Sequence, residues 1–311
     1  MSARQLGIVV GADDSAPSVA AVAWAARDAE LRNVPLTLVH VIAPVVTPIE
    51  PWVEPSSPAN FSQYQEHQAH EIVEQARKVA AEATSPDRAS RIACEVLHGP
   101  VVPALVDLST RADMVVVGCR GRGAVARSLL GSVSSGVVHQ AQCPVAVFHD
   151  EDPVTARPPR APVVVGIDGS PTSELATEIA FDEASRRGVD LVALHAWSDM
   201  GPLDFASMNW APIEWRNIEA REEEVLAERL CGWRERYPDV TLRKVVVCDR
   251  PALRLLEQAE AAQLVVLGSH GRGGFPGMLL GSVSRTVVNS AQIPVIVARM
   301  PRHSGESSES L

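Results

Sequence analysis

The chain is poor in cysteine and in long apolar runs, and each shortage excludes a class of protein. The cysteines are odd in number and form no C-x-x-C pair; they are Cys94, Cys119, Cys143, Cys231 and Cys248. Because no signal peptide is recognisable either, the sequence predicts a cytoplasmic protein without a disulfide framework. No apolar run approaches the roughly 20 residues that a membrane-spanning helix needs, so we expect no membrane insertion.

Positive charge is also scarce. The 28 Lys and Arg residues stand against 38 Asp and Glu residues, which gives a formal net charge of −10. This excess of acidic residues argues against nucleic acid as the main partner. It does not argue against a small anion in a locally positive pocket, because backbone donors and a few arginines act at short range.

Two common nucleotide-binding motifs are missing from the chain. No Gly-Lys dipeptide occurs, which excludes a Walker A loop and its phosphate-binding lysine. The turns that begin at Gly11 and Gly166 read Gly-Ala-Asp-Asp and Gly-Ile-Asp-Gly instead of G-x-G-x-x-G. These turns argue against a dinucleotide-binding fold of the dehydrogenase type.

A different glycine pattern occurs twice. Gly118 to Ser132 and Gly268 to Ser282 both fit Gly-x2-Gly-x9-Gly-Ser, and each follows a short apolar run typical of a buried strand. Such a turn lets backbone N–H groups close around an anion, and the helix that follows adds its own N-terminal donors. The glycines could be ordinary turn residues, but two copies in the same register favour a phosphate site in each half.

The repeat extends over nearly the whole chain. Val10–Ser15 corresponds to Val165–Ser170, and Gln142–Val145 corresponds to Gln292–Val295. With 311 residues the chain is long enough for two domains, each with its own core. We predict a first domain in residues 1–150, a linker in 151–162, a second domain in 163–300 and a flexible tail in 301–311.

Helices and strands alternate in each half, and the strands are continuous runs of Val, Ile and Leu. This order predicts an α/β fold with two tandem doubly wound, Rossmann-like domains, each with a five-stranded parallel sheet flanked by helices. Ser15 and Ser170 are the expected N-caps of the first helix in each half. Residues 43–65 and 199–218 are expected to be long loops, of the kind that serve as lids or partner surfaces.

Several side chains fall where a doubly wound sheet binds ligands, beyond the carboxyl ends of its strands. Asp13 and Asp168 could contact a nucleoside or Mg²⁺, or could simply start a helix. Asp199 could accept a hydrogen bond from a ribose hydroxyl in the second half only. Positive charge for a phosphate tail is available from loop arginines, which could also be solvated: Arg120, Arg122, Arg127 and Arg272.

At these residues the chain resembles the universal stress protein family, in the tandem form common in mycobacteria and related actinobacteria. The glycine pattern, in register with an Asp near the end of the first strand, is that of the ATP-binding branch. The resemblance implies ATP, with Mg²⁺, in each half. The nucleoside would be lined by Gly11, Asp13, Gly166 and Asp168, with adenine meeting the backbone of Val41 or Ala196.

The resemblance also assigns the remaining contacts, to ribose and to the phosphates. In the first half these are expected from Gly118, Cys119, Arg120, Gly121, Arg122, Gly123, Ala124, Gly131, Ser132, Val133 and Ser134. In the second half they are expected from Gly268, Ser269, His270, Gly271, Arg272, Gly273, Gly274, Gly281, Ser282, Val283 and Ser284. Gly118→Ala or Gly268→Ala should then abolish binding in its half, because a methyl group would crowd the approach to the phosphates.

The family resemblance implies a regulator of stress adaptation, dormancy or growth control, with its two domains paired and the chain forming a homodimer. An enzyme for phosphoryl transfer would need a positioned base, a fixed metal and an electrophilic Lys or Arg, and the sequence shows no such set. A non-catalytic protein is therefore predicted. The alternatives are a slow ATPase or autophosphorylating protein, and a docking scaffold with vestigial pockets. Substitutions between the halves, Asp14 for Gly169 and Gly99 for Asp249, predict unequal affinities.

Overall fold

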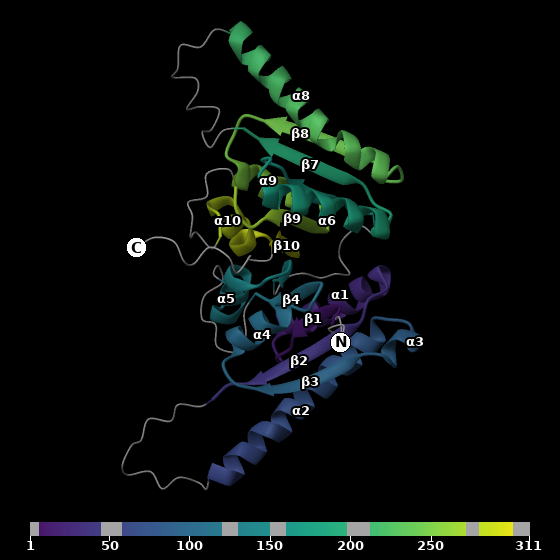
Figure 1. The fold of residues 1–311 in the computed structure, drawn as a ribbon, viewed down its shortest axis with the longest axis vertical. Helices are drawn as coiled ribbons and strands as arrows, with labels where there is room; N and C mark the ends of the chain where they lie inside the picture. The colour runs from purple at the N-terminus through teal and green to yellow at the C-terminus, as the bar shows by residue number, and fades with distance from the viewer. Residues whose placement is uncertain are drawn as a thin grey trace, which may run out of the picture. The chain divides into compact units, whose positions relative to one another are not determined.

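The computed structural model describes residues 6–44, 58–119, 130–149, 160–197, 212–271 and 280–300. The chain divides into two compact units (Figure 1). The first unit contains the described residues within 6–119 and 131–149, and the second contains residue 130 and those within 160–300. No helix in the described part of the chain is long and apolar enough to cross a membrane.

The first unit is a five-stranded parallel sheet in the order β3-β2-β1-β4-β5. Its strands are β1 (Ile8–Gly11), β2 (Leu36–Ile42), β3 (Ala93–His98), β4 (Met114–Gly118) and β5 (Val145–Phe148). Its helices are α1 (Ala16–Arg32), α2 (Pro58–Glu82), α3 (Pro86–Ala89), α4 (Val101–Ser109) and α5 (Ser132–Gln140). The strand order reverses between β1 and β4, and ligands bind at such switch points in doubly wound sheets.

The second unit repeats this topology, with the parallel order β8-β7-β6-β9-β10. Its strands are β6 (Val163–Gly166), β7 (Leu191–Ala196), β8 (Leu242–Val247), β9 (Leu264–Gly268) and β10 (Val295–Ala298). Its helices are α6 (Pro171–Arg187), α8 (Pro212–Arg236), α9 (Pro251–Ala259) and α10 (Ser282–Ser290). The prediction of two Rossmann-like α/β domains with five-stranded parallel sheets is confirmed.

The central strands are buried because helices cover both faces of each sheet. In the first unit α4 packs against α5, while α1 packs against α2 (Figure 1). Ile8, Val9 and Val10 of β1 are completely inaccessible, as are Val163, Val164 and Val165 of β6. Burial of apolar side chains on both faces of the strands explains why the strands are continuous apolar runs instead of alternating ones.

The first helix of each unit begins and ends in the same way. The Ser15 hydroxyl accepts a hydrogen bond from the Ser18 N–H, and Ser170 accepts one from the Ser173 N–H, as predicted for N-caps. The C-caps Asn33 and Gly188 both adopt left-handed backbone conformations, with φ of 57° and 62°. Asn and Gly tolerate this region best, so the local sequence determines both ends of the helix.

The long loops after the second strands are shorter than predicted. Helix α2 already begins at Pro58 and α8 at Pro212, so the expectation of loops through residues 65 and 218 is wrong. Proline is favoured at the first helical position because its fixed φ suits the helix and its missing N–H would have no partner there. Residues 45–57 and 198–211 lie outside the described residues.

Candidate functional site

A cavity of about 520 Å³ opens in the second unit at the carboxyl ends of β6, β7 and β9. One side is apolar and includes Leu194, Leu255 and Leu267. The lining also includes glycine backbone and the first turn of α10. Ten of the predicted site residues line this cavity: Gly166, Asp168, Ala196, Gly268, His270, Gly271, Gly281, Ser282, Val283 and Ser284.

Asp13 in the first unit and Asp168 in the second each form the turn that leads from the first strand into the first helix. Asp168 Oδ1 accepts hydrogen bonds from the Ser170 N–H (2.9 Å) and the Ser170 hydroxyl (2.7 Å). Asp13 Oδ1 accepts the equivalent bonds from Ser15, at 3.0 and 2.5 Å. A carboxylate bonded to the backbone two residues on forms an Asx turn, which fixes the direction in which the chain enters the helix. One oxygen of each carboxylate is therefore engaged in the turn.

The first motif glycine of each unit is required by packing within the protein. A Cβ at Gly268 would lie 2.7 Å from Thr172 Oγ1 and 2.9 Å from the Ser173 nitrogen, and one at Gly271 would lie 2.5 Å from Asp168 Oδ2. In the first unit, a Cβ at Gly118 would lie 2.9 Å from both Pro17 Cβ and the Ser18 nitrogen. The expected reason for these glycines was crowding of phosphates. The observed reason is close contact between the loop and the start of the neighbouring helix.

The third motif glycine differs from the other two. A Cβ at Gly281 would find its nearest neighbour at 3.5 Å, an ordinary contact distance. Gly281 is the N-cap of α10 and provides no side-chain cap for the helix. The first N–H groups of a helix have no partner within the helix, so an uncapped start beside a cavity favours binding of an anion. Gly131 caps α5 of the first unit in the same way.

Ser134 and Ser284, which lie two residues after the serine of each Gly-Ser pair, hold the glycine loop in place. The Ser284 hydroxyl donates to the Gly268 carbonyl oxygen and the Ser134 hydroxyl donates to that of Cys119, both at 2.6 Å. Ser134 and Ser284 are buried, whereas Ser132 and Ser282 are exposed. The protons of the buried hydroxyls are thus committed to the protein, and any direct hydroxyl donor to a phosphate would be Ser132 or Ser282.

Sequence comparison identifies the family to which this architecture belongs. The family described as "Universal stress protein family" matches the chain twice, over residues 7–149 and 160–299. The chain belongs to the universal stress protein family. Each match covers one unit, and together they form the tandem arrangement predicted from the repeat.

Close relatives of this universal stress protein occur in mycobacteria. Universal stress protein Rv1996 of Mycobacterium tuberculosis is 65% identical over 312 residues, which cover 97% of this chain and 98% of that protein. Universal stress protein Rv2623 of the same organism is 51% identical over 294 residues, covering 94% and 96%. Among solved structures, a universal stress protein from Archaeoglobus fulgidus superposes with a TM-score of 0.64 at 21% identity, covering 95% and 96% of the chains. This likeness supports the fold.

The wall of the cavity in this universal stress protein also contains a partly buried polar pair. His195 is 4% exposed; its Nδ1 lies 2.7 Å from the Ile167 carbonyl oxygen and its Nε2 lies 3.0 Å from Glu222 Oε2. A carbonyl oxygen only accepts, so Nδ1 is the donor in the bond to Ile167. His195 therefore combines a bond to the backbone after β6 with a position on the cavity wall.

Glu222 was missed by the sequence analysis, although it lines the cavity. It lies on α8, 27 residues after His195, in a helix whose charged residues give no sign of which one faces inward. In the first unit His40 forms the equivalent bond to the Ala12 carbonyl oxygen at 2.8 Å. No partner for its second ring nitrogen occurs within the described residues.

The remaining predicted residues fall into two groups. In the first unit Gly11, Asp13, Val41, Gly118 and Gly131 lie at the carboxyl ends of β1, β2 and β4 or at the start of α5, with Cys119 only 2% exposed. Ser269 is also buried, with its N–H bonded to the Ala298 carbonyl oxygen. The others lie outside the described residues: Arg120, Gly121, Arg122, Gly123, Ala124, Arg127, Asp199, Arg272, Gly273 and Gly274.

Metal-binding side chains do not gather anywhere in the described ranges: no group of three or more His, Cys, Asp or Glu residues there could hold an ion. Asp168 is the one predicted Mg²⁺ contact on the cavity wall of the second unit, and its Oδ1 is engaged in the Asx turn. Mg²⁺ is commonly bound by one or two carboxylates together with substrate phosphates. The donors present therefore suit an ion that arrives with a phosphorylated ligand.

Proposed function

We propose that this universal stress protein binds ATP in the cavity of the second unit and at the corresponding position of the first, and that it acts as a nucleotide-responsive regulator. The observation that carries the proposal is the cavity wall itself. Two glycine backbone segments and the uncapped N-terminus of α10 meet there, beside the carboxyl ends of three parallel strands.

The dimensions and chemistry of the cavity suit a nucleotide. Its volume of about 520 Å³ lies within the range of about 300–1,000 Å³ that is usual for small-ligand sites. Its apolar wall suits a base, while the Gly271 backbone and the start of α10 suit a phosphate tail. We place the nucleoside near Asp168 and Ala196, and the phosphates near Gly271, Gly281 and Ser282.

A few hydrogen-bond donors of this kind are enough to bind ATP with useful affinity in a cell. A hydrogen bond to a charged group contributes about 1.5–3 kcal/mol, and a helix terminus contributes up to about 2 kcal/mol. Three or four such contacts, reduced by the cost of ordering the ligand, correspond to about −8 kcal/mol and a dissociation constant on the order of micromolar. The protein could respond to ATP without turning it over.

The described polar residues around the cavity favour binding over catalysis. The Asp168 carboxylate is used in a turn, and His195 and Glu222 bond to each other. No described side chain stands out as a base poised for an attacking water. Slow hydrolysis, autophosphorylation and a scaffold role are the competing functions. A setting in stress adaptation, dormancy or growth control, together with domain pairing and homodimer formation, remains a prediction from the family.

Thermal unfolding of the full chain with and without Mg-ATP tests the proposal. At a ligand concentration of 100 times the dissociation constant, binding adds about 2.7 kcal/mol to the stability. This should raise the melting temperature by a few degrees. Calorimetric titration gives the number of sites. An unchanged melting temperature and no heat of binding at millimolar Mg-ATP would contradict the proposal.

Gly281→Ala makes the test specific to the site. The added methyl group makes no close contact with the protein, so the fold should be retained, but it adds bulk to the cavity wall where we place the phosphates. We expect at least a tenfold loss of ATP affinity at that site. Gly232→Ala on α8, where a Cβ meets nothing within 4 Å, is the control and should bind ATP as the native protein does.

Release of labelled phosphate separates a regulator from a slow enzyme. Turnover faster than about one per minute, a rate well below typical enzyme values, would favour the enzyme if Asp13→Ala or Asp168→Ala abolished it. Slower release that is insensitive to these substitutions would favour the regulator. Nucleotide that stays bound to the protein through mild purification would exclude the scaffold with vestigial pockets.

A further inference from the structure

We propose that Thr172 is a positioning residue of the second nucleotide site: its hydroxyl holds the peptide between His270 and Gly271 so that the Gly271 N–H is available to the ligand. This inference rests on the proposed function and extends it by assigning different behaviour to the two sites. Thr172 itself does not line the cavity. It lies in the first turn of α6, behind the glycine loop.

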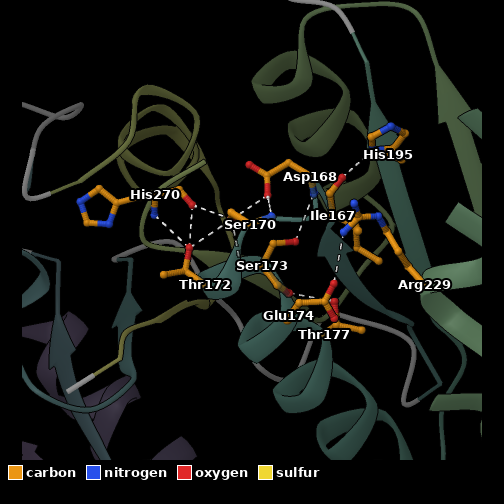
Figure 2. Close-up of polar contacts among 10 residues, drawn as sticks. All are labelled: Ile167, Asp168, Ser170, Thr172, Ser173, Glu174, Thr177, His195, Arg229 and His270. Carbon is orange, nitrogen blue, oxygen red and sulfur yellow. Dashed lines mark hydrogen bonds and ion pairs between the residues drawn. The ribbon is translucent and has the colours of Figure 1, made fainter. Parts of the chain in front are cut away.

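The contacts between α6 and the loop are shown in Figure 2. The Thr172 hydroxyl donates to the His270 carbonyl oxygen at 2.6 Å, across 98 residues of sequence. The Ser170 hydroxyl lies 3.1 Å from the same oxygen. Gly268 makes this approach possible, because a Cβ there would lie 2.7 Å from Thr172 Oγ1. The first motif glycine and Thr172 thus form one packed arrangement.

Counting protons shows that Thr172 is the donor on which this carbonyl depends. A serine hydroxyl has a single proton, and Ser170 Oγ lies 2.7 Å from Asp168 Oδ1 as well as 3.1 Å from the His270 carbonyl oxygen. The carboxylate is both closer and the stronger acceptor, so the Ser170 proton goes to Asp168. The proton of Thr172 then makes the short bond to His270.

The direction of this carbonyl determines the direction of the next N–H. The described residues contain no cis peptide bond, so the His270 C=O and the Gly271 N–H point in opposite directions across a planar unit. With the oxygen held toward the start of α6, the N–H is turned away from that helix. Gly271 lines the cavity, and its nitrogen lies near Gly281 at the start of α10. The donor is therefore oriented before any ligand arrives.

The corresponding helix position of the first unit has no hydroxyl donor. Pro17 occupies the second position of α1, where α6 has Thr172, and a proline has no hydroxyl to give. Its ring packs against Gly118, since a Cβ on that glycine would lie 2.9 Å from Pro17 Cβ. Orienting a donor before binding lowers the ordering cost of binding. We infer that the second unit holds the tighter of the two ATP sites.

The test compares three variants of the full chain. Thr172→Val removes the hydroxyl while keeping the shape, and Thr172→Ser restores a hydroxyl. Thr177→Val is the matched control, because Thr177 lies on the same helix, is buried and donates to the Ser173 carbonyl oxygen at 2.9 Å. Two measurements are made on each: hydrogen exchange of the loop without ligand, and calorimetric titration with Mg-ATP.

We expect Thr172→Val to speed amide hydrogen exchange in the segment 268–271. We also expect it to raise the dissociation constant of the tighter Mg-ATP site about fivefold, which is the equivalent of one lost hydrogen bond. The dissociation constant of Thr172→Ser for Mg-ATP should stay within about twofold of that of the native protein. Thr177→Val should change neither quantity, even if it lowers the melting temperature as much as Thr172→Val does.

Other outcomes overturn the inference in distinguishable ways. Unchanged exchange in Thr172→Val shows that the hydroxyl does not hold the loop. Faster exchange with unchanged affinity shows that loop order does not affect binding. A Thr172→Ser variant as weak as Thr172→Val shows that a hydroxyl at this position does not by itself restore binding, which contradicts the role proposed for it. If the native protein itself takes up no Mg-ATP, the proposed function fails first, and the exchange result still shows whether the tether exists.

Discussion

The two units of this universal stress protein share their backbone geometry and differ in the side chains around it. Both have an Asx turn after the first strand, a serine N-cap and a left-handed C-cap on the first helix. Both also bury an ion pair one turn from the end of that helix, Asp28 with Arg32 and Glu183 with Arg187, each at 2.7 Å. Duplication has preserved the positions that determine how the chain folds.

The two units differ in side chains that surround the candidate site. The second unit ties its glycine loop to α6 through Thr172 and places Glu222 beside His195, whereas the first unit has Pro17 and a histidine without such a partner within the described residues. Gly169 and Asp14 occupy equivalent turn positions but differ in backbone conformation. The comparison shows that two domains with the same fold can place different side chains around the same site, because affinity depends on side chains that folding does not require.

The largest predicted effect concerns a feature that the units share. Gly118→Ala and Gly268→Ala should each lower the free energy of unfolding by about 2–3 kcal/mol, because the new methyl group meets backbone at 2.9 Å. Urea denaturation without ligand measures the loss. Gly281→Ala serves as the comparison and should cost much less. Full stability combined with lost ATP binding would show instead that these glycines matter only for the ligand.

A swap of turn residues tests how far the units are interchangeable. Gly169 has φ of 78° and a Cβ there would collide with the Arg229 guanidinium, so Gly169→Asp should lower stability by about 1–2 kcal/mol. Asp14→Gly should cost only about 0.5–1 kcal/mol, mainly through backbone entropy. Thermal unfolding of both variants provides the measurement. Equal losses would mean that the two turns do not differ in strain.

Glu222→Ala probes the polar pair that only the second unit has been found to contain. Removing the carboxylate leaves His195 Nε2 without its partner at 3.0 Å, and we expect a loss of about 1 kcal/mol, since the pair is only partly screened from solvent. Glu224→Ala, at an exposed position on the same helix, is the control. Equal stability of the two variants in urea would show that the pair contributes nothing.

The smallest predicted effect is the pH dependence of Asp249, which stands where the first unit has Gly99. The Arg250 backbone N–H, assisted by the Arg254 guanidinium, lowers the pKa of the Asp249 carboxyl group. A carboxyl group whose pKa is lowered by folding stabilises the protein above its unfolded pKa of about 4, and this contribution is lost as the pH falls further.

Asp249→Asn should therefore lower the free energy of unfolding slightly at pH 7 and progressively less as the solution is acidified below pH 4. Urea denaturation of both proteins at pH 7 and pH 3 measures the difference. Gly99→Ala offers a second comparison, because Gly99 has φ of 135° and its variant should lose stability equally at both pH values. A larger deficit for Asp249→Asn at pH 3 would show that the sign is wrong.

Much of the site could be predicted from sequence because its elements are local. A glycine pattern, an Asp-x-Ser turn and an apolar strand each depend on neighbouring residues, and their order determines that they meet at one edge of the sheet. The reason for Gly118 and Gly268 could not be predicted, because it depends on which atoms of α1 and α6 approach within 3 Å. The extent of α2 and α8 was also missed, since both helices begin at a proline, a residue that is also common in loops and turns.

The amino-acid sequence alone determined the class of fold, the duplication and the serine N-caps of the first helices, because these follow from short-range pattern and residue chemistry. It also predicts the place where a phosphate would be held. Only the tertiary structure decided that Thr172 bonds to His270 and that Glu222 meets His195, across 98 and 27 residues. Such contacts form between surfaces brought together by packing, and a single side chain in a polar helix carries no signal of the partner that it will face.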